Sequence, residues 1–182
     1  MLEGKNVNLR VAEKEDIPLI TEWYNNLDVI GEYEFSPQIS RAEREKNFDK
    51  ASSEPRPFEV KEFIIEKKDG TKVGTIGHYL TGSLLEIGYL VVPSERGKGY
   101  CTEATQLMVD YLFLSKDTVR IQAHTDVRNV ASQKTLEKTG FRKEGIIRKS
   151  SFVKGKWTDS FLYSILKEEW KKPKILTKVT RE

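Results

Sequence analysis

Hydrophobic and polar residues alternate over residues 6–11, which predicts a first β-strand with one buried face. The spacing then changes to an apolar residue every three or four positions. This predicts a helix that Asp16 caps and that carries Pro18 in its first turn. Its apolar positions are Leu19, Ile20, Trp23, Tyr24 and Leu27. The chain therefore opens with a strand and a core-facing helix.

A second helix is expected after Ser40, because Ser40 and Glu43 form a capping box in which each side chain satisfies the other's backbone donor. The segment has few apolar residues, so we expect it on the surface. It ends at residues 53–57, where two prolines stop a helix.

The middle of the chain predicts a meander of three strands and a helix. Asp69-Gly70 is a strong hairpin signal, and Gly82 marks the next turn. The strands span residues 59–67, 72–80 and 84–92. The helix that follows carries an apolar stripe made of Ala104, Leu107, Met108, Tyr111 and Leu112.

The last third predicts a strand, a helix and a hairpin. The strand covers residues 119–126, Asn129 caps the helix, and Gly140 ends it. The hairpin starts at Phe141 and turns at residues 154–156. This mixture of helices and strands predicts an α/β (α+β) fold.

Composition fits one domain. The 182 residues are 37% hydrophobic and 32% charged, enough for a single core. We expect the domain to span residues 1–170 and a basic tail to span residues 171–182. The tail is expected to be solvated and partly frayed, with its cations at Lys171, Lys172, Lys174, Lys178 and Arg181.

Several classes of protein are disfavoured. Apolar runs are short and no signal peptide is recognisable, which predicts a cytoplasmic protein without a membrane partner. The formal charge of +3 comes from 31 basic and 28 acidic residues well mixed along the chain, so no direct nucleic-acid partner is expected. Cys101 is the only cysteine, and His78 and His124 are the only histidines, which leaves no metal site and no intramolecular disulfide. The oligomeric state stays open, a homodimer included.

The turn after the third meander strand is the most informative segment. It reads Arg96-Gly97-Lys98-Gly99-Tyr100-Cys101 and runs directly into a helix. Backbone N–H groups of a glycine-rich turn and of a helix N-terminus point into one concavity that suits a phosphate. An ordinary strand-to-helix turn with two solvated cations is the alternative interpretation. A dinucleotide fingerprint fits worse, since Thr102 stands where a third small residue should be.

The turn resembles the R/Q-x-x-G-x-G/A motif of the GNAT superfamily of acetyl-CoA-dependent N-acyltransferases, with Cys101 in place of the last Gly or Ala. A second match joins residues 129–132 to Glu137-Lys138-Thr139-Gly140-Phe141, which is similar to the family's N-x-x-[AS] helix and E-K-x-G-F end. Residues resembling the Rim-type branch, which acetylates N-termini of ribosomal proteins, are Trp23, Asn25, Asn26, Asp28, Gly155, Trp157 and Asp159. The resemblance implies a mixed, mostly antiparallel sheet of about seven strands flanked by about four helices.

The resemblance also implies acetyl-CoA as the co-substrate, without a metal. The pyrophosphate would lie on the N–H groups of Arg96, Gly97, Lys98, Gly99, Tyr100, Cys101 and Thr102. The backbone of Leu90, Val91 and Val92 would pair with the pantetheine arm and polarise the acetyl carbonyl. Asn129 and Ser132 would complete the cofactor site, although helix capping alone would account for Asn129.

Glu86 is the candidate base. Apolar neighbours in its strand would raise its pKa toward the working pH. The alternative is that Glu86 is a carboxylate on a solvated strand edge. Glu103, in the first turn of the helix that follows the glycine-rich turn, is another candidate base, which we interpret as structural. By resemblance, Ser132 is the candidate acid that protonates the departing thiolate, because Leu136 stands where many family members carry tyrosine. The reaction can also proceed with no essential acid. Cys101 is interpreted as a small space-filler, not as an acyl carrier.

The acceptor is expected to be a primary amine. A neutral α-amine needs less help from a base than a lysine or polyamine amine, which favours a protein N-terminus, ribosomal proteins being the implied partners. The cleft would be lined by Trp23, Tyr33, Phe35, His78, Trp157 and Asp159. The alternatives are a small amine such as a polyamine or antibiotic, and a non-catalytic acyl-CoA sensor or interaction module.

Overall fold

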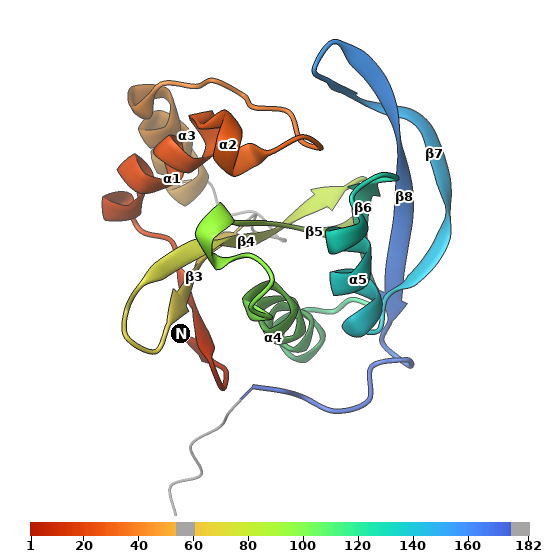
Figure 1. The fold of residues 1–182 in the computed structure, drawn as a ribbon. Coiled ribbons are helices and arrows are strands. Elements are labelled where there is room, and N and C mark those ends of the chain that lie inside the picture. The colour runs from red at the N-terminus through yellow and green to blue at the C-terminus, as the bar shows by residue number, and fades with distance from the viewer. Residues whose placement is uncertain (54–60, 176–182) are drawn as a thin grey trace, which may run out of the picture.

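The computed structural model describes residues 1–53 and 61–175, which form one twisted sheet with helices on both faces (Figure 1). The strands are β1 (Leu2–Glu3), β2 (Val7–Val11), β3 (Lys61–Lys67), β4 (Lys72–Thr81), β5 (Leu84–Val91), β6 (Arg120–Asp126), β7 (Arg142–Val153) and β8 (Lys156–Leu166). The helices are α1 (Ile17–Asn25), α2 (Leu27–Ile30), α3 (Arg41–Ser53), α4 (Tyr100–Ser115) and α5 (Val130–Lys138), with short 3₁₀ turns at Lys14–Asp16 and Pro93–Glu95.

The strands of the described residues lie in the order β1-β2-β3-β4-β5-β6-β8-β7. Every neighbouring pair is antiparallel except β5 and β6, which are parallel because α4 carries the chain across the sheet between them. This confirms the predicted α+β fold. The eighth strand is β1, whose two residues pair with Asn8 and Leu9 of β2 and are too short to show a periodicity.

The two faces of the sheet are covered by different helices, and Figure 1 shows α1, α2 and α3 grouped apart from α4 and α5. Side chains of successive strand residues point to opposite faces. In β3, Ile65 therefore packs with Leu107 of α4, whereas Ile64 packs with Ile20 of α1. Leu136 of α5 is fully buried in the α4 side of the core. Glu86 and His124 lie on the α1 side.

Asp16 stands at the N-cap position of α1, as predicted, but its side chain does not make the expected cap hydrogen bond. Its carboxylate makes no cap bond to α1, because residues 14–16 form a 3₁₀ turn and the side chain turns back to accept from Glu13 N at 2.9 Å. Arg10 and Lys72 also donate to it, at 2.8 and 2.7 Å. Burial alone would raise the pKa of Asp16, but these hydrogen bonds hold it well below its usual range.

Other local predictions are confirmed in whole or in part. Gly70 adopts φ +85° in the β3–β4 turn. Of the capping box, the Ser40 half is present, because Ser40 Oγ accepts from Glu43 N at 3.1 Å at the start of α3. The predicted helix stop at residues 54–57 and the strand start at residues 59–60 lie outside the described residues.

The start of the tail is held against the domain, contrary to the expected fraying. Trp170 Nε1 donates to Asp110 of α4 at 2.7 Å, and the backbone N–H groups of Lys174 and Ile175 donate to the same carboxylate. A buried carboxylate needs such donors, which explains why the chain docks there. Lys178 and Arg181 lie outside the described residues. Within the described ranges, helices are all too short or too polar to span a bilayer.

Candidate active site

A gap opens between β5 and β6. The two strands pair only at Leu85–Ile121 and Glu86–Gln122, and β5 continues for five residues without β6 as a partner. On its other side, Val92 N donates to Val73 O of β4 at 3.0 Å. Backbone groups alternate sides along a strand, so Val91 N–H faces the gap.

This alternation limits which backbone N–H groups can donate to the pantetheine arm. Val92 N–H is occupied by Val73, and Leu90 N–H faces β4 by the same alternation. Of the three residues expected to donate to the arm, only Val91 offers a backbone donor to the gap. Pairing of the arm with the backbone of Leu90 and Val92 stays a prediction, and it cannot use the N–H of Val92, which donates to Val73 O.

The predicted anion cradle lies at the carboxyl end of β5. Gly97 and Gly99 adopt left-handed φ values of +77° and +86°, and Gly99 caps α4. The N–H groups of residues 97–102 find no protein acceptor among the described residues. A Cβ built on either glycine would meet no atom within 4 Å, so the concavity is open. These features fit the diphosphate of acetyl-CoA.

Arg96 takes a different role from the one expected. Its backbone N–H donates to Pro93 O at 3.3 Å, and its guanidinium donates to Val91 O at 2.9 Å and to Val29 O. It thus ties the turn to β5 and α2 and does not offer its N–H to a phosphate. The neighbouring Lys98 pairs with Glu95 at 3.1 Å on the surface.

Two further residues of α4 are structural. Enclosure of the Cys101 thiol raises its pKa to about 12, so it stays protonated and unreactive, as the space-filler interpretation requires. Glu103 accepts from Asn6 N and Asn6 Nδ2, both at 2.8 Å, and so fastens the start of β2 to α4.

Glu86 is buried, but its carboxylate is surrounded by donors instead of apolar groups. Tyr79 and Thr81 of β4 donate to it at 2.7 and 2.9 Å, and Gln122 of β6 donates at 3.0 Å. His124 Nδ1 lies 2.6 Å from Oε1. Burial alone would raise the pKa of Glu86, but the hydrogen bonds from His124, Tyr79 and Gln122 outweigh it and lower the pKa to about 2. The predicted raised pKa is therefore wrong.

His124 was not among the predicted site residues. Its side chain is 27% exposed and shares a face with Gln122 and Glu86. Its alternation with Ile121 and Ala123, which are buried on the α4 side, indicates the face on which it lies. The sequence does not indicate that β6 is the strand beside Glu86.

A tyrosine and a serine meet on the other face. Tyr89 Oη lies 2.8 Å from Ser132 Oγ, and Asn129 Oδ1 accepts from Ser132 N at 3.1 Å at the start of α5. Burial, above all, raises the pKa of Tyr89 far above its usual value. Leu136, where the family resemblance implies a tyrosine, is fully buried in the core. Tyr89 was also absent from the predicted site.

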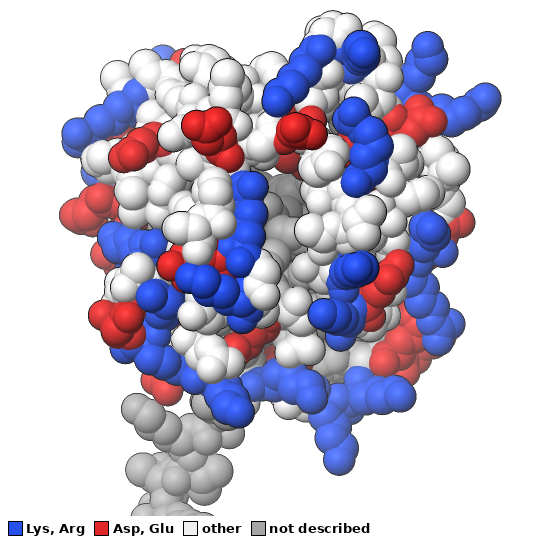
Figure 2. All heavy atoms as spheres, in the orientation of Figure 1, with Lys and Arg blue, Asp and Glu red and all other residues white. Residues whose placement is uncertain are grey.

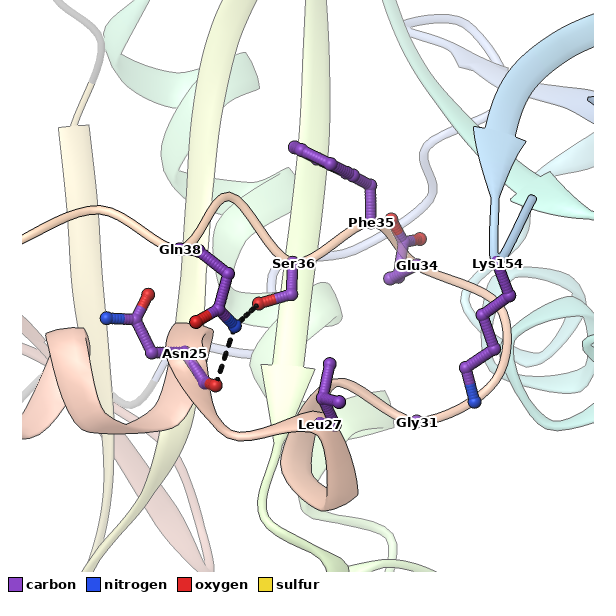
Figure 3. A pocket seen from close by; sticks show the side chains of 8 residues that line it. All are labelled: Asn25, Leu27, Gly31, Glu34, Phe35, Ser36, Gln38 and Lys154. Atoms are coloured by element: carbon purple, nitrogen blue, oxygen red, sulfur yellow. Dashed lines mark hydrogen bonds between the residues drawn. The ribbon is translucent and has the colours of Figure 1, made fainter.

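An open recess of about 430 Å³ lies where residues 25–38 approach the β7–β8 turn (Figure 3). Its lining consists of Asn25, Leu27, Gly31, Glu34, Phe35, Ser36, Gln38 and Lys154. Gln38 Nε2 donates to Asn25 O at 2.9 Å and to Ser36 Oγ at 2.7 Å, as Figure 3 shows. Asn25 Oδ1 is buried and has no hydrogen-bond partner among the described residues.

Glu34 is the residue of this recess that interacts electrostatically with Tyr79 and Tyr89. Glu34 is exposed at the surface, yet desolvation of its carboxyl and the charge of Asp126 raise its pKa. Its charge adds to the effect of burial on the pKa of both Tyr79 and Tyr89. The Glu34 carboxyl is therefore close enough to act on Tyr79, which donates to Glu86, and on Tyr89, which contacts Ser132.

The residues expected to line the acceptor cleft divide into three groups. Phe35 lines the recess, and Tyr33 lies under the Arg128 guanidinium at 5.4 Å. Trp23 is buried among Val29, Ile30 and Leu90, and His78 is buried against Tyr111 on the α4 side, so neither lines the recess. Trp157 is 60% exposed and packs on Phe152, while Asp159 accepts from Lys149 N at 2.8 Å, both in the β7–β8 hairpin.

The surface carries no extended field of one sign on the face that Figure 2 shows. Basic and acidic side chains are interleaved there, and the surface is hollowed near the middle of the view, between α5 and the turn that precedes α4.

Known proteins share this fold and parts of this sequence. The family described as "Acetyltransferase (GNAT) domain" matches residues 6–142. "Probable N-acetyltransferase YjcK" of Bacillus subtilis (strain 168) is 32% identical over 181 residues, covering 91% of this chain and 97% of that protein.

Two solved structures are similar as well. The spermidine N-acetyltransferase from Vibrio cholerae in complex with CoA and spermine has a TM-score of 0.81 at 22% identity and covers 90% of this chain and 97% of its own. RimL, a ribosomal L7/L12 alpha-N-protein acetyltransferase in complex with coenzyme A, has a TM-score of 0.78 at 19% identity, with 89% and 94% covered. At these identities the two structures show the shared fold alone.

Proposed function

This chain belongs to the GNAT acetyltransferase family and is an acetyl-CoA-dependent N-acetyltransferase, and we propose that it acetylates the α-amine at the N-terminus of a protein or peptide. Acetyl passes directly from the thioester to the amine in a ternary complex. The single observation that carries the choice of acceptor is the charge balance of the open recess.

The recess contains one carboxylate, Glu34, and one ammonium, Lys154. Its other polar groups are the neutral side chains of Asn25, Ser36 and Gln38. A polyamine carries several positive charges and would require several carboxylates in the same space. A peptide N-terminus brings one positive charge and a chain of amides, which this lining suits better.

The basicity of the acceptor supports the same choice. An α-amine has a pKa of about 7.7 to 8.0 and is partly neutral at pH 7, whereas a lysine amine near 10.4 is neutral in fewer than about one molecule in a thousand. The relatives include a ribosomal-protein N-terminal acetyltransferase and a spermidine acetyltransferase, so both amines belong in the test.

The acceptor is tested by coenzyme release from acetyl-CoA with a panel of amines. Peptides with free N-termini, taken from ribosomal proteins among others, are expected to be acetylated at least ten times more efficiently than spermidine. The same peptides blocked at the N-terminus but retaining an internal lysine are the matched control. Preferential turnover of spermidine or of the blocked peptides would contradict the proposal.

Direct transfer predicts that Cys101→Ala keeps at least half of the wild-type kcat. The thiol is enclosed, and its pKa is raised to about 12, so almost no thiolate exists to attack the thioester. Initial rates at varied acetyl-CoA and amine should give intersecting lines, as expected for a ternary complex. Parallel lines together with an inactive alanine variant would establish a covalent acyl-enzyme instead.

A further inference from the structure

We propose that His124 is the base that removes the proton from the acceptor amine, and that Glu86 is the positioning residue that holds and orients its ring. The inference rests on the proposed function, because it concerns the same transfer. In this proposal Glu86 does not take the proton of the amine itself, but holds His124, which does. The observation behind it is the 2.6 Å contact between His124 Nδ1 and Glu86 Oε1.

Glu86 is poorly suited to take the proton itself. Four side chains already surround its two oxygens, and the hydrogen bonds from His124, Tyr79 and Gln122 lower its pKa to about 2. A base works best when its pKa lies near the working pH. Glu86 is also only 4% exposed, so an incoming amine has little access to it.

The contact with Glu86 determines which ring nitrogen of His124 carries a hydrogen. An ionised carboxylate can only accept hydrogen bonds, so Nδ1 must carry the hydrogen in this contact. The neutral ring then has its lone pair on Nε2, on the side away from Glu86. The side chain is 27% exposed, which leaves it open to the acceptor side of the sheet.

The other groups around His124 are consistent with a base. Tyr79 of β4 reaches it only through Glu86, and Leu162 of β8 is its uncharged neighbour in the sheet. Asp126, two residues along β6 on the same face, is paired with Arg128 at 2.7 Å. Glu34 acts on Asp126 from the recess. No lysine or arginine of the described residues contacts the Glu86–His124 pair.

The proposed step balances as follows. His124 Nε2 takes one proton from the acceptor ammonium, and the resulting imidazolium is stabilised by Glu86. The amine nitrogen forms a bond to the acetyl carbon, and the carbon–sulfur bond breaks. The second N–H proton ends on the departing sulfur, and His124 returns its proton to water.

The test compares wild type, His124→Asn and Glu86→Gln on one accepted peptide across pH. At neutral pH, His124→Asn is expected to lower kcat/KM about 100-fold, the usual scale of a positioned base. Glu86→Gln keeps an acceptor for Nδ1 but removes the charge, and about a 10-fold loss is expected. Both losses should shrink as pH rises through the pKa of the amine, and free imidazole should partly restore His124→Ala. Acetyl-CoA affinity, measured by calorimetry, should change less than twofold.

Thr81→Ala is the matched control, because it removes a 2.9 Å bond to the other oxygen of Glu86 and leaves the His124 contact in place. A loss smaller than about threefold is expected for it. Profiles of His124→Asn that run parallel to wild type at every pH, or an equal loss in Thr81→Ala, would overturn the proposal. If wild type acetylates spermidine and no peptide, the proposed acceptor is wrong, and the same profiles measured on spermidine still test His124.

Discussion

Replacing Gly99 with valine is expected to weaken acetyl-CoA binding at least 100-fold, or about 2.7 kcal/mol, in a protein that remains folded. Gly99 caps α4 at φ +86°, and a Cβ there would meet no protein atom within 4 Å. A valine side chain would therefore extend into the concavity where the N–H groups of residues 97–102 converge. Backbone could then no longer approach a diphosphate closely. Calorimetric titration with acetyl-CoA measures the loss.

The valine also adds backbone strain, which must be separated from the loss of the site. A non-glycine residue in the left-handed region costs about 1 to 2 kcal/mol. Gly70→Val is the matched control, since Gly70 has φ +85° with equally open surroundings, in the β3–β4 turn. Both variants should lose similar thermal stability, but only Gly99→Val should lose affinity. A folded Gly99→Val that binds acetyl-CoA like wild type would contradict the cradle assignment.

Local chemistry made the cradle and the turns predictable. Glycines at the β3–β4 turn and before α4 adopt the left-handed conformation that their sequence context predicts, and Asn129 caps α5 through its side chain. Each of these features depends on residues a few positions apart. Sequence alone therefore specifies them, together with the apolar stripe of α4.

The surroundings of Glu86 and Arg96 could be predicted only in part, because their contacts join segments that are distant in the sequence. The face of Glu86 follows from the alternation in β5, but its partner His124 lies 38 residues away across the α4 crossover. Arg96 binds the carbonyl of Val29, 67 residues earlier, which its motif does not indicate. Aromatic residues were equally ambiguous, since Trp23 is core while Trp157 is exposed. Periodicity indicates which face a residue occupies but not which strand lies next to it.

The sulfur that leaves in the transfer needs a hydrogen-bond donor, and candidates lie near Tyr89. A coenzyme thiol with a pKa of roughly 8.5 can leave as a thiolate, but an anion beside buried side chains is unstable without a hydrogen-bond donor. Ser132 is the acid that the family resemblance implies, and Tyr89 Oη lies 2.8 Å from its hydroxyl. Tyr89 stays protonated at working pH, because burial raises its pKa. The two hydroxyls are expected to donate hydrogen bonds to the sulfur anion until the second N–H proton of the amine reaches it.

Tyr89→Phe should lower kcat about 10- to 150-fold, because a hydrogen bond to a charged group is worth about 1.5 to 3 kcal/mol. The KM for the amine should be nearly unchanged, and the ring still packs in the core. Ser132→Ala should show a loss of the same size. The double variant should be little worse than either single one, since the hydroxyls act as one unit. Tyr163→Phe is the control, because that buried tyrosine donates to Glu137 at 3.1 Å, away from the gap. Steady-state kinetics of the four variants tests this role. Equal losses in Tyr89→Phe and Tyr163→Phe, or additive losses in the double variant, would show that Tyr89 does not stabilise the departing sulfur through a hydrogen bond.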